Sequence, residues 1–254
     1  MPEQVVFDIG FHRGEDTRCY LAGGFRVVAA EANPLLAAEG RKRFSEEIAA
    51  GRLVLLNVGV VEHASVQSFW INHSRSEWSS FNASMGCRGE KGGHSVEVEC
   101  VMFEKLLEAY GVPHYLKIDI EGNDIFCIRG IAPSSLPRYL SCEASDPELL
   151  ELLREKGYTK FKMINQFDGF RAFDRARELS VSGSWQKTLR WNLSRLTGRA
   201  ARFPAGGSGP FGEEADGAWL AFDVVAAHYR SFYTPEGKPL NDRSWFDFHA
   251  TFDA

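Results

Sequence analysis

Apolar residues along the chain gather into short, almost unbroken runs that alternate with stretches of mixed apolar and charged residues. The runs lie at residues 5–9, 25–30, 53–61 and 139–144. A strand that is buried on both faces of a parallel sheet has this character. Helical composition follows the first two runs, at residues 14–21 and 35–50. The pattern therefore predicts an α/β fold built on a mostly parallel sheet.

The rest of the chain continues the alternation of strands and helices. Strict alternation of apolar and polar residues predicts a half-exposed strand at 95–101, and a short extra strand is expected at 66–71. Further strands are expected at 115–121, 158–166 and 244–252, and further helices at 103–111, 124–130, 147–156 and 219–229. Residues 73–93 are rich in Ser, Asn and Gly and predict a long loop, which in a compact domain usually has a function.

A glycine turn follows the first predicted strand. Asp8 precedes Gly10, and Gly14 opens a helix whose first turn carries Glu15 and Asp16. Glycine allows the backbone to turn sharply or to approach a ligand closely. In open α/β sheets, such a strand–turn–helix unit holds a nucleotide-like ligand at the carboxyl end of the strand. An ordinary turn in an α/β domain is the alternative.

Glu31 ends the second strand, 21 residues after Gly10. An acid at this place can accept hydrogen bonds from ribose hydroxyls. Asn57, near the end of the third run, is placed to hydrogen-bond an adenine base, although a polar residue without a role is equally expected at a strand end. Together with Ala32 and Val58, these residues predict an adenosine-type ligand. We expect the residues 73–93 to lie over its pocket.

The glycine spacing indicates which cofactor carries the adenosine. A dinucleotide fingerprint would have glycines at positions 10, 12 and 15, where this chain has Gly10, His12 and Glu15. The acids at the helix start would repel a diphosphate, whereas Asp8 suits an ammonium group. S-adenosylmethionine has an ammonium, a sulfonium and a ribose. The predicted cofactor-binding residues are Asp8, Gly10, His12, Gly14, Thr17, Glu31, Ala32, Asn57 and Val58.

Three charged residues alternate with apolar ones in the strand expected at 115–121. Lys117, Asp119 and Glu121 approach the carboxyl end of this strand, where ligands of α/β sheets bind. An exposed edge strand with solvated charges is the alternative. These three are the predicted catalytic residues. Methyl transfer to a hydroxyl needs a base or a metal, and which of the two acids is the base stays open.

Two other sources of catalysis are less favoured. A metal held by Asp119, Glu143 and a histidine is conceivable, but no metal ligand is assigned and the use of a metal stays open. His12 and His249 are alternative bases, although a single histidine is more often structural.

Several stretches together resemble the FkbM family of S-adenosylmethionine-dependent methyltransferases. They are VVFDIGFHRGEDTRCYLAGG, VVAAEANP, YLKIDIEGND, YLSCEAS and GYTKFKMINQ, in this order, with WFDFH near the end. The resemblance covers residues 4–170 well and implies a Rossmann-like class I methyltransferase sheet whose last strand is antiparallel. It also implies O-methylation of a hydroxyl on a sugar or natural product, without naming one. A non-catalytic domain that binds the cofactor and an NAD-linked oxidoreductase are the alternatives.

Composition limits the cellular setting and the partners. The chain has 254 residues, which we assign to a single domain, and a net charge of −5, which argues against binding of nucleic acid. Its five cysteines have no zinc or redox spacing and predict reduced thiols in the cytoplasm. The first strand begins so early that no signal peptide is expected, and no apolar run reaches the roughly 20 residues of a spanning helix. The expected partner is a small-molecule or saccharide acceptor.

A basic segment interrupts the acidic chain before the last strand. Residues 171–202 hold eight lysines and arginines against two acids, and Trp185, Leu189, Leu193 and Leu196 follow helical spacing. We expect residues 171–215 to form a helical cap beside the acceptor pocket that attracts an anionic acceptor. A solvated basic helix and a helix on a membrane surface are the alternatives.

Overall fold

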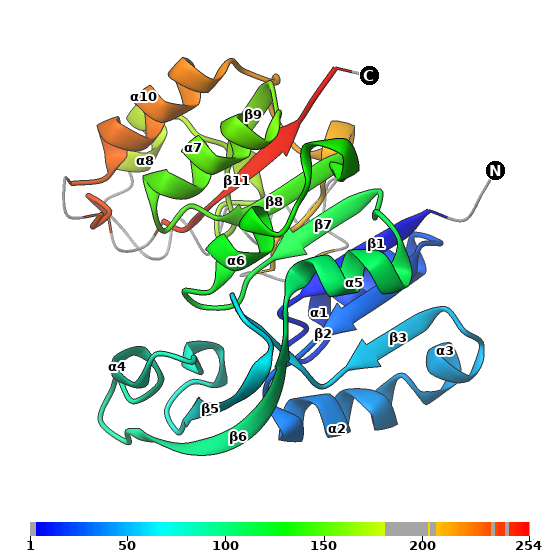
Figure 1. Cartoon of the computed structure of the whole chain (residues 1–254). Helices are drawn as coiled ribbons and strands as arrows, with labels where there is room; N and C mark the ends of the chain where they lie inside the picture. Colours follow the sequence, from blue (N-terminus) through cyan, green and yellow to red (C-terminus); the bar gives the residue numbers. More distant parts are fainter. Residues whose placement is uncertain (1–3, 181–202, 204–206, 235–236, 242–243, 254) are drawn as a thin grey trace. The chain divides into compact units, whose positions relative to one another are not determined.

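The computed structural model in Figure 1 describes residues 4–180, 203, 207–234, 237–241 and 244–253. These residues form two compact units, the first up to Pro137 and the second from Arg138.

Four parallel strands form the main sheet of the first unit. In sheet order they are β3 (Leu53–Leu56), β2 (Arg26–Ala30), β1 (Val5–Ile9) and β7 (Tyr115–Ile118). Every residue of β7 is buried, and the apolar residues of β1 and β2 are largely buried as well. The sequence prediction of a parallel sheet is confirmed, because β1 pairs in parallel with β2 and β7, and β2 pairs in parallel with β3. The alternative of an exposed edge strand for β7 is wrong, since all four of its residues are buried.

The helices of the first unit follow the strands as expected. They are α1 (Glu15–Ala22), α2 (Pro34–Arg43), α3 (Ser45–Ala49), α5 (Phe103–Tyr110), α6 (Asp124–Arg129) and the short 3-10 helix η2 (Pro133–Ser135). The helix predicted at 35–50 is divided into α2 and α3 at Phe44. α2 begins sharply because the Asn33 side chain accepts a hydrogen bond from the backbone N–H of Leu35.

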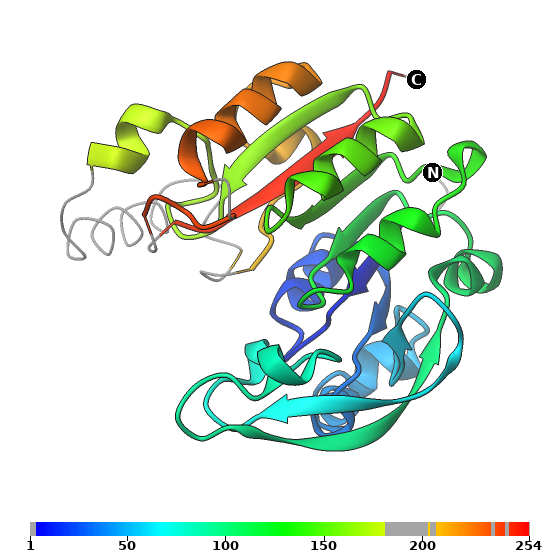
Figure 2. The same cartoon turned by 60° about the vertical axis from the view of Figure 1, so that its left-hand side comes forward.

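The first unit also contains a second, three-stranded sheet, whose strands lie between β3 and α5 in the sequence. Its strands are β4 (Gly59–Val60), β6 (Gly93–Val101) and β5 (Ser65–Asn72), in that order. We call residues 59–101 the arm. Between β5 and β6 it carries the short helices η1 (Ser76–Trp78) and α4 (Ala83–Gly86), where the sequence predicted a loop. Figure 2 shows β5 and β6 as a long twisted ribbon in cyan to teal, with α4 near one end.

The second unit holds the strands β10 (Arg171–Ala172), β9 (Lys160–Asn165), β11 (Phe246–Thr251) and β8 (Tyr139–Glu143), in sheet order. β11 runs antiparallel to both β8 and β9, which confirms the prediction of an antiparallel last strand. Helices of this unit are α7 (Pro147–Lys156), α8 (Arg175–Ser180), η4 (Gly212–Glu214) and α10 (Phe222–Phe232). α10 lies three residues further along the chain than predicted. The whole chain thus has the α/β architecture that the sequence predicts.

The predicted basic cap is only partly described. Within residues 171–215 the structure has β10, α8 and η4. The apolar stripe from Trp185 to Leu196, with Arg190, Arg195 and Arg199, lies outside the described residues. The cap and the assignment of the chain to one domain therefore stay predictions. In the described part of the chain, no helix has both the length and the apolar character needed to cross a membrane.

Candidate functional site

The glycine turn after β1 lies directly against the backbone that follows β7. Gly10 has a φ of +97°, and a Cβ at this position would lie 1.8 Å from the carbonyl oxygen of Asp119. The backbone N–H groups of Gly10 and Phe11 both donate to the carbonyl of Ala30, at 3.0 Å each. Only glycine satisfies both the left-handed backbone and the close approach. The turn therefore joins the carboxyl ends of β1, β2 and β7.

Lys117 and Asp8 form a buried ion pair at the same edge of the sheet. Their side chains are 3% and 1% exposed, and Lys117 Nζ lies 3.0 Å from Asp8 Oδ1. The ammonium also donates to the carbonyl of Gly10 at 2.6 Å, and the hydroxyl of Thr17 donates to Asp8 Oδ2 at 2.6 Å. Burial acts to lower the pKa of Lys117, but the charges of Asp8 and Asp119 raise it well above its usual range. Lys117 is thus a charged internal link between β1 and β7.

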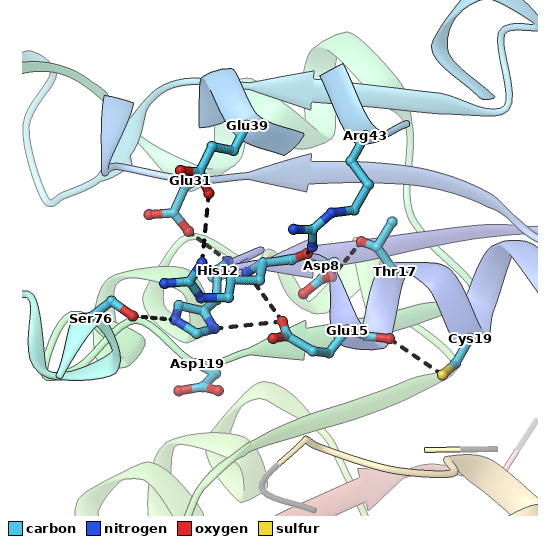
Figure 3. A network of polar contacts seen from close by, with 12 residues as sticks. Asp8, His12, Glu15, Thr17, Cys19, Glu31, Glu39, Arg43, Ser76 and Asp119 are labelled. Atoms are coloured by element: carbon cyan, nitrogen blue, oxygen red, sulfur yellow. Dashed lines mark hydrogen bonds and ion pairs between the residues drawn. The ribbon is translucent and has the colours of Figure 1, made fainter. Parts of the chain in front are cut away.

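Glu31 is held by two backbone N–H groups at the end of β2. Its Oε2 accepts from His12 N at 2.6 Å, between residues that Figure 3 labels, and its Oε1 accepts from Asn33 N at 2.8 Å. The residue is 8% exposed, and burial raises the pKa of its carboxyl to about 7 despite these hydrogen bonds. Because a carboxylate has about four acceptor positions, Glu31 keeps the capacity to accept further hydrogen bonds.

His12 joins the glycine turn to the arm. Its ring lies 2.8 Å from the hydroxyl of Ser76 and 3.5 Å from the carboxylate of Glu15, and the three side chains meet in Figure 3. Its φ of +52° is unusual for a residue with a Cβ. Burial lowers the pKa of His12, but Glu15, with Glu31 and Glu77, raises it by more, so the net shift is upward.

Asn57 lies between β3 and the arm, and its side chain bonds to the backbone that follows β2. Its amide nitrogen donates to the carbonyls of Glu31 at 2.8 Å and Ala32 at 3.1 Å. This geometry favours the plainer of the two interpretations of the sequence, a polar side chain that stabilises a strand end. Ala32 packs against the apolar core of the arm, and Val58 is half-buried between β3 and β4.

Two carboxylates follow β7, because this strand ends at Ile118 and does not extend to residue 121 as the sequence predicted. Asp119 lies 3.7 Å from Lys117 Nζ, and its side chain is 38% exposed. Glu121 has a φ of +47°, and its Oε2 lies 3.1 Å from Arg88 Nη2 in the arm. Burial raises the pKa of Glu121 to about 7, and Asp119 and Asp124 add to the rise while Arg88 opposes it. The turn thus offers one exposed carboxylate and one that titrates near neutral pH.

The alternatives to these carboxylates are weaker in the structure. His249 lies inside β11 and is 1% exposed, and burial, with the charge of Lys162, lowers its pKa to about 3. Its burial inside the strand and its lowered pKa disfavour the interpretation of His249 as a base. Across the described residues, no three His, Cys, Asp or Glu side chains are grouped so as to hold a metal ion.

The arm supplies residues that the sequence did not single out. Ser76, Ser80 and Arg88 contact the turns that carry His12 and Glu121. The loop predicted at residues 73–93 contains all three residues. No local sequence pattern, however, indicates which of its side chains contact the sheet.

Comparison with known proteins shows which family the chain resembles. A family model described as the methyltransferase FkbM domain matches residues 8–160. No curated protein matches the chain.

Solved structures share the chain's fold only remotely. A precorrin-6y C5,15-methyltransferase from Geobacter metallireducens has 14% identity over 64% of this chain and 67% of its own, with a TM-score of 0.39. A SAM-dependent methyltransferase from Geobacter sulfurreducens, in complex with S-adenosyl-L-homocysteine, has 13% identity over 99% and 86%, with a TM-score of 0.38. An O-methyltransferase from a polyketide synthase multienzyme of Brevibacillus brevis has 12% identity over 99% and 67%, also at 0.38. Likenesses this remote do not bear on the substrate.

Proposed function

Because the chain belongs to the methyltransferase FkbM family, we propose that it transfers a methyl group to a hydroxyl of a small-molecule or saccharide acceptor. Membership makes the chain a methyltransferase that uses S-adenosylmethionine. The observation that carries the choice of a hydroxyl is the pair of carboxylates after β7, Asp119 and Glu121. A hydroxyl is a poor nucleophile until a base removes its proton, and these carboxylates are suited to that task.

The residues around the glycine turn fit the cofactor. The Glu31 carboxylate is fixed by two backbone N–H groups and can accept hydrogen bonds from a ribose diol. Four acids lie at this edge of the sheet: Glu15 and Asp16 in the first turn of α1, with Asp119 and Glu31. Negative charge favours the binding of an ammonium and a sulfonium over that of a diphosphate. When bound, the cofactor supplies an activated methyl group, whose bond to sulfur breaks as its bond to the acceptor oxygen forms.

We assign Lys117, Asp8 and Thr17 to positioning. The sequence marks Lys117 as catalytic and Asp8 and Thr17 as ligands of the cofactor, but all three side chains are buried, and Lys117 and Thr17 both contact the Asp8 carboxylate. Lys117 fixes the carbonyl of Gly10 and lies beside Asp119. Its role is therefore to hold the glycine turn and the exposed carboxylate in one geometry. Asp119 is the more accessible partner for an ammonium group.

Composition and the family resemblance support a cellular location and a class of acceptor. We propose a cytoplasmic enzyme, because the spacing of the five cysteines fits neither a zinc site nor a redox motif. A sugar or natural-product acceptor follows from the family resemblance. The net charge of −5 supports an acceptor other than nucleic acid.

An assay of S-adenosylhomocysteine release tests this function. The parent protein is incubated with S-adenosylmethionine and a panel of hydroxylated sugars, sugar acids and phenols, and methylated products are identified by mass spectrometry. We expect transfer to oxygen, and we expect Asp119→Asn and Glu121→Gln each to lower turnover at least tenfold with an unchanged circular dichroism spectrum. Transfer to nitrogen or carbon alone, or full activity in both variants, would contradict the proposal.

A further inference from the structure

The arm makes a second contact with the sheet, at the turn after β7. Arg88 Nη2 donates to Glu121 Oε2 at 3.1 Å, the hydroxyl of Ser80 donates to the Glu121 carbonyl at 2.8 Å, and the Asn123 amide donates to the carbonyl of Val60 at 2.9 Å. Both the backbone and the side chain of Glu121 are thus bonded to the arm. These contacts distinguish Glu121 from an acid that is simply solvated at the surface.

The Arg88 guanidinium is itself held in place. Its central carbon lies 4.6 Å from the centre of the Trp78 ring, within the range of a cation–π contact. A planar guanidinium that stacks on an indole loses freedom in the stack and presents its N–H groups in a fixed direction. The Arg88 side chain is 35% exposed and that of Glu121 is 18% exposed, so the pair is partly shielded from water.

The charges that face Glu121 come from two directions. Asp119, two residues earlier, and Asp124, at the start of α6, are acids, and Arg88 in the arm is the cation that pairs with Glu121. Burial and the two acids favour the protonated form of Glu121, whereas Arg88 favours the carboxylate. Glu121 also occupies a left-handed backbone conformation, which is strained for a residue with a Cβ. Such strain persists where the surrounding structure fixes a functional side chain.

We propose that Arg88, stacked on Trp78, is a positioning residue that orients the Glu121 carboxylate as the base for the acceptor hydroxyl. This inference rests on the proposed function and divides the two acids between roles that the sequence left open. The hydroxyl proton passes to Glu121 as the new carbon–oxygen bond forms, and it leaves Glu121 for water after the product departs. Asp119, linked to Lys117, serves the cofactor side.

The arm contains a matched control for Arg88. Arg75 also places its guanidinium over Trp78, at 4.9 Å from the ring centre, but within the described residues it makes no ion pair with Glu121. Arg75→Met therefore removes a cation and a stacking contact from the same indole while it leaves Glu121 paired. Arg88→Lys keeps the charge and loses the planar stack.

Titration of the Glu121 carboxyl gives the first test and needs no acceptor. Protein with ¹³C-labelled glutamate is titrated by NMR with S-adenosylhomocysteine as the probe, and the Glu121 signal is identified by its loss in Glu121→Gln. Since Arg88 favours the carboxylate, we expect Arg88→Met to raise the apparent pKa of Glu121 by about one unit, a tenfold change in proton affinity. Arg75→Met should leave the titration unchanged. An unchanged titration in Arg88→Met would overturn the proposal.

Kinetics gives the second test, on the acceptor from the panel that is methylated fastest. We expect Arg88→Met to lower kcat at least tenfold with the KM for S-adenosylmethionine unchanged, and to move the acid limb of the kcat/KM profile to higher pH. Arg88→Lys should recover part of the loss, and Arg75→Met should match the parent. A parent that transfers no methyl group to oxygen would refute the proposed function, whereas the NMR titration would still decide the place of Arg88. An active parent with an unshifted Arg88→Met profile would refute the inference alone.

Discussion

Lys117 shows how one residue connects two motifs that are far apart in the sequence. It lies opposite Asp8 in the register of β7 and β1, so the two side chains share a face of the sheet. A lone charge at this buried position would be costly, and the ion pair offsets that cost. Lys117 therefore joins the glycine turn to the strand that carries the predicted catalytic acids.

Replacement of Lys117 tests this link. Lys117→Met leaves the Asp8 carboxylate buried without its cation, and we expect the free energy of unfolding to fall by about 3–5 kcal/mol in urea denaturation. Asp8→Asn in the same chain should restore much of the loss, because no buried charge then remains. Lys105→Met removes an exposed ion pair with Glu108 and serves as the control, for which we expect no measurable change. Equal stability of Lys117→Met and the control would contradict the assignment.

Glu31 predicts a pH dependence of stability. Its carboxyl has a pKa of about 7 in the folded chain, against 4.5 as the ordinary value, because it is buried. The folded state therefore binds more protons than the unfolded state between these values, and stability falls as pH rises through this window. We expect the ligand-free parent to lose roughly 2–3 kcal/mol more than Glu31→Gln between pH 4.5 and pH 7. Parallel stability curves for the two proteins would show that Glu31 is not shifted.

At the scale of elements, the close approach of the turn after β1 to the backbone after β7 fixes the site. Gly10→Ala would place a methyl group against the carbonyl of Asp119, in a left-handed conformation. We expect a loss of more than about 3 kcal/mol and no binding of S-adenosylhomocysteine. Gly24→Ala is the matched control, since Gly24 has a φ of +86° but nothing lies within 4 Å of its Cβ position. Its cost should stay near the roughly 1–2 kcal/mol of the backbone alone. Chemical denaturation of both variants measures the difference.

The sequence predicts elements better than it predicts their contacts. The apolar runs and the glycine turn indicate β1, α1, β2 and β7 because each depends on neighbouring residues. The apolar run at 53–61 forms two strands, because the polar Asn57 bonds to backbone carbonyls and separates β3 from β4. The contacts of His12 with Ser76 and of Glu121 with Arg88 join residues 64 and 33 positions apart, and no local pattern encodes them.

At the scale of the whole molecule, the role of the basic segment before β11 stays a prediction. We expect residues 171–215 to attract an anionic acceptor. A triple variant in which Gln replaces Arg190, Arg195 and Arg199 should then raise the acceptor KM about tenfold at low salt and less at high salt. The affinity for S-adenosylhomocysteine should not change. Binding of the parent to anionic vesicles would instead favour a membrane-surface helix, and a triple variant that matches the parent in both assays would remove the electrostatic role.

The family, the acidic edge of the sheet and the Glu31 carboxylate together lead to one central claim, that this edge binds S-adenosylmethionine through its ribose and its positive charge. Titration calorimetry with S-adenosylhomocysteine and with NAD tests it most directly. We predict binding of S-adenosylhomocysteine that Glu31→Ala weakens by roughly 1–3 kcal/mol, the cost of leaving hydrogen-bonding groups unpaired. Tight binding of NAD with none of S-adenosylhomocysteine would contradict the account.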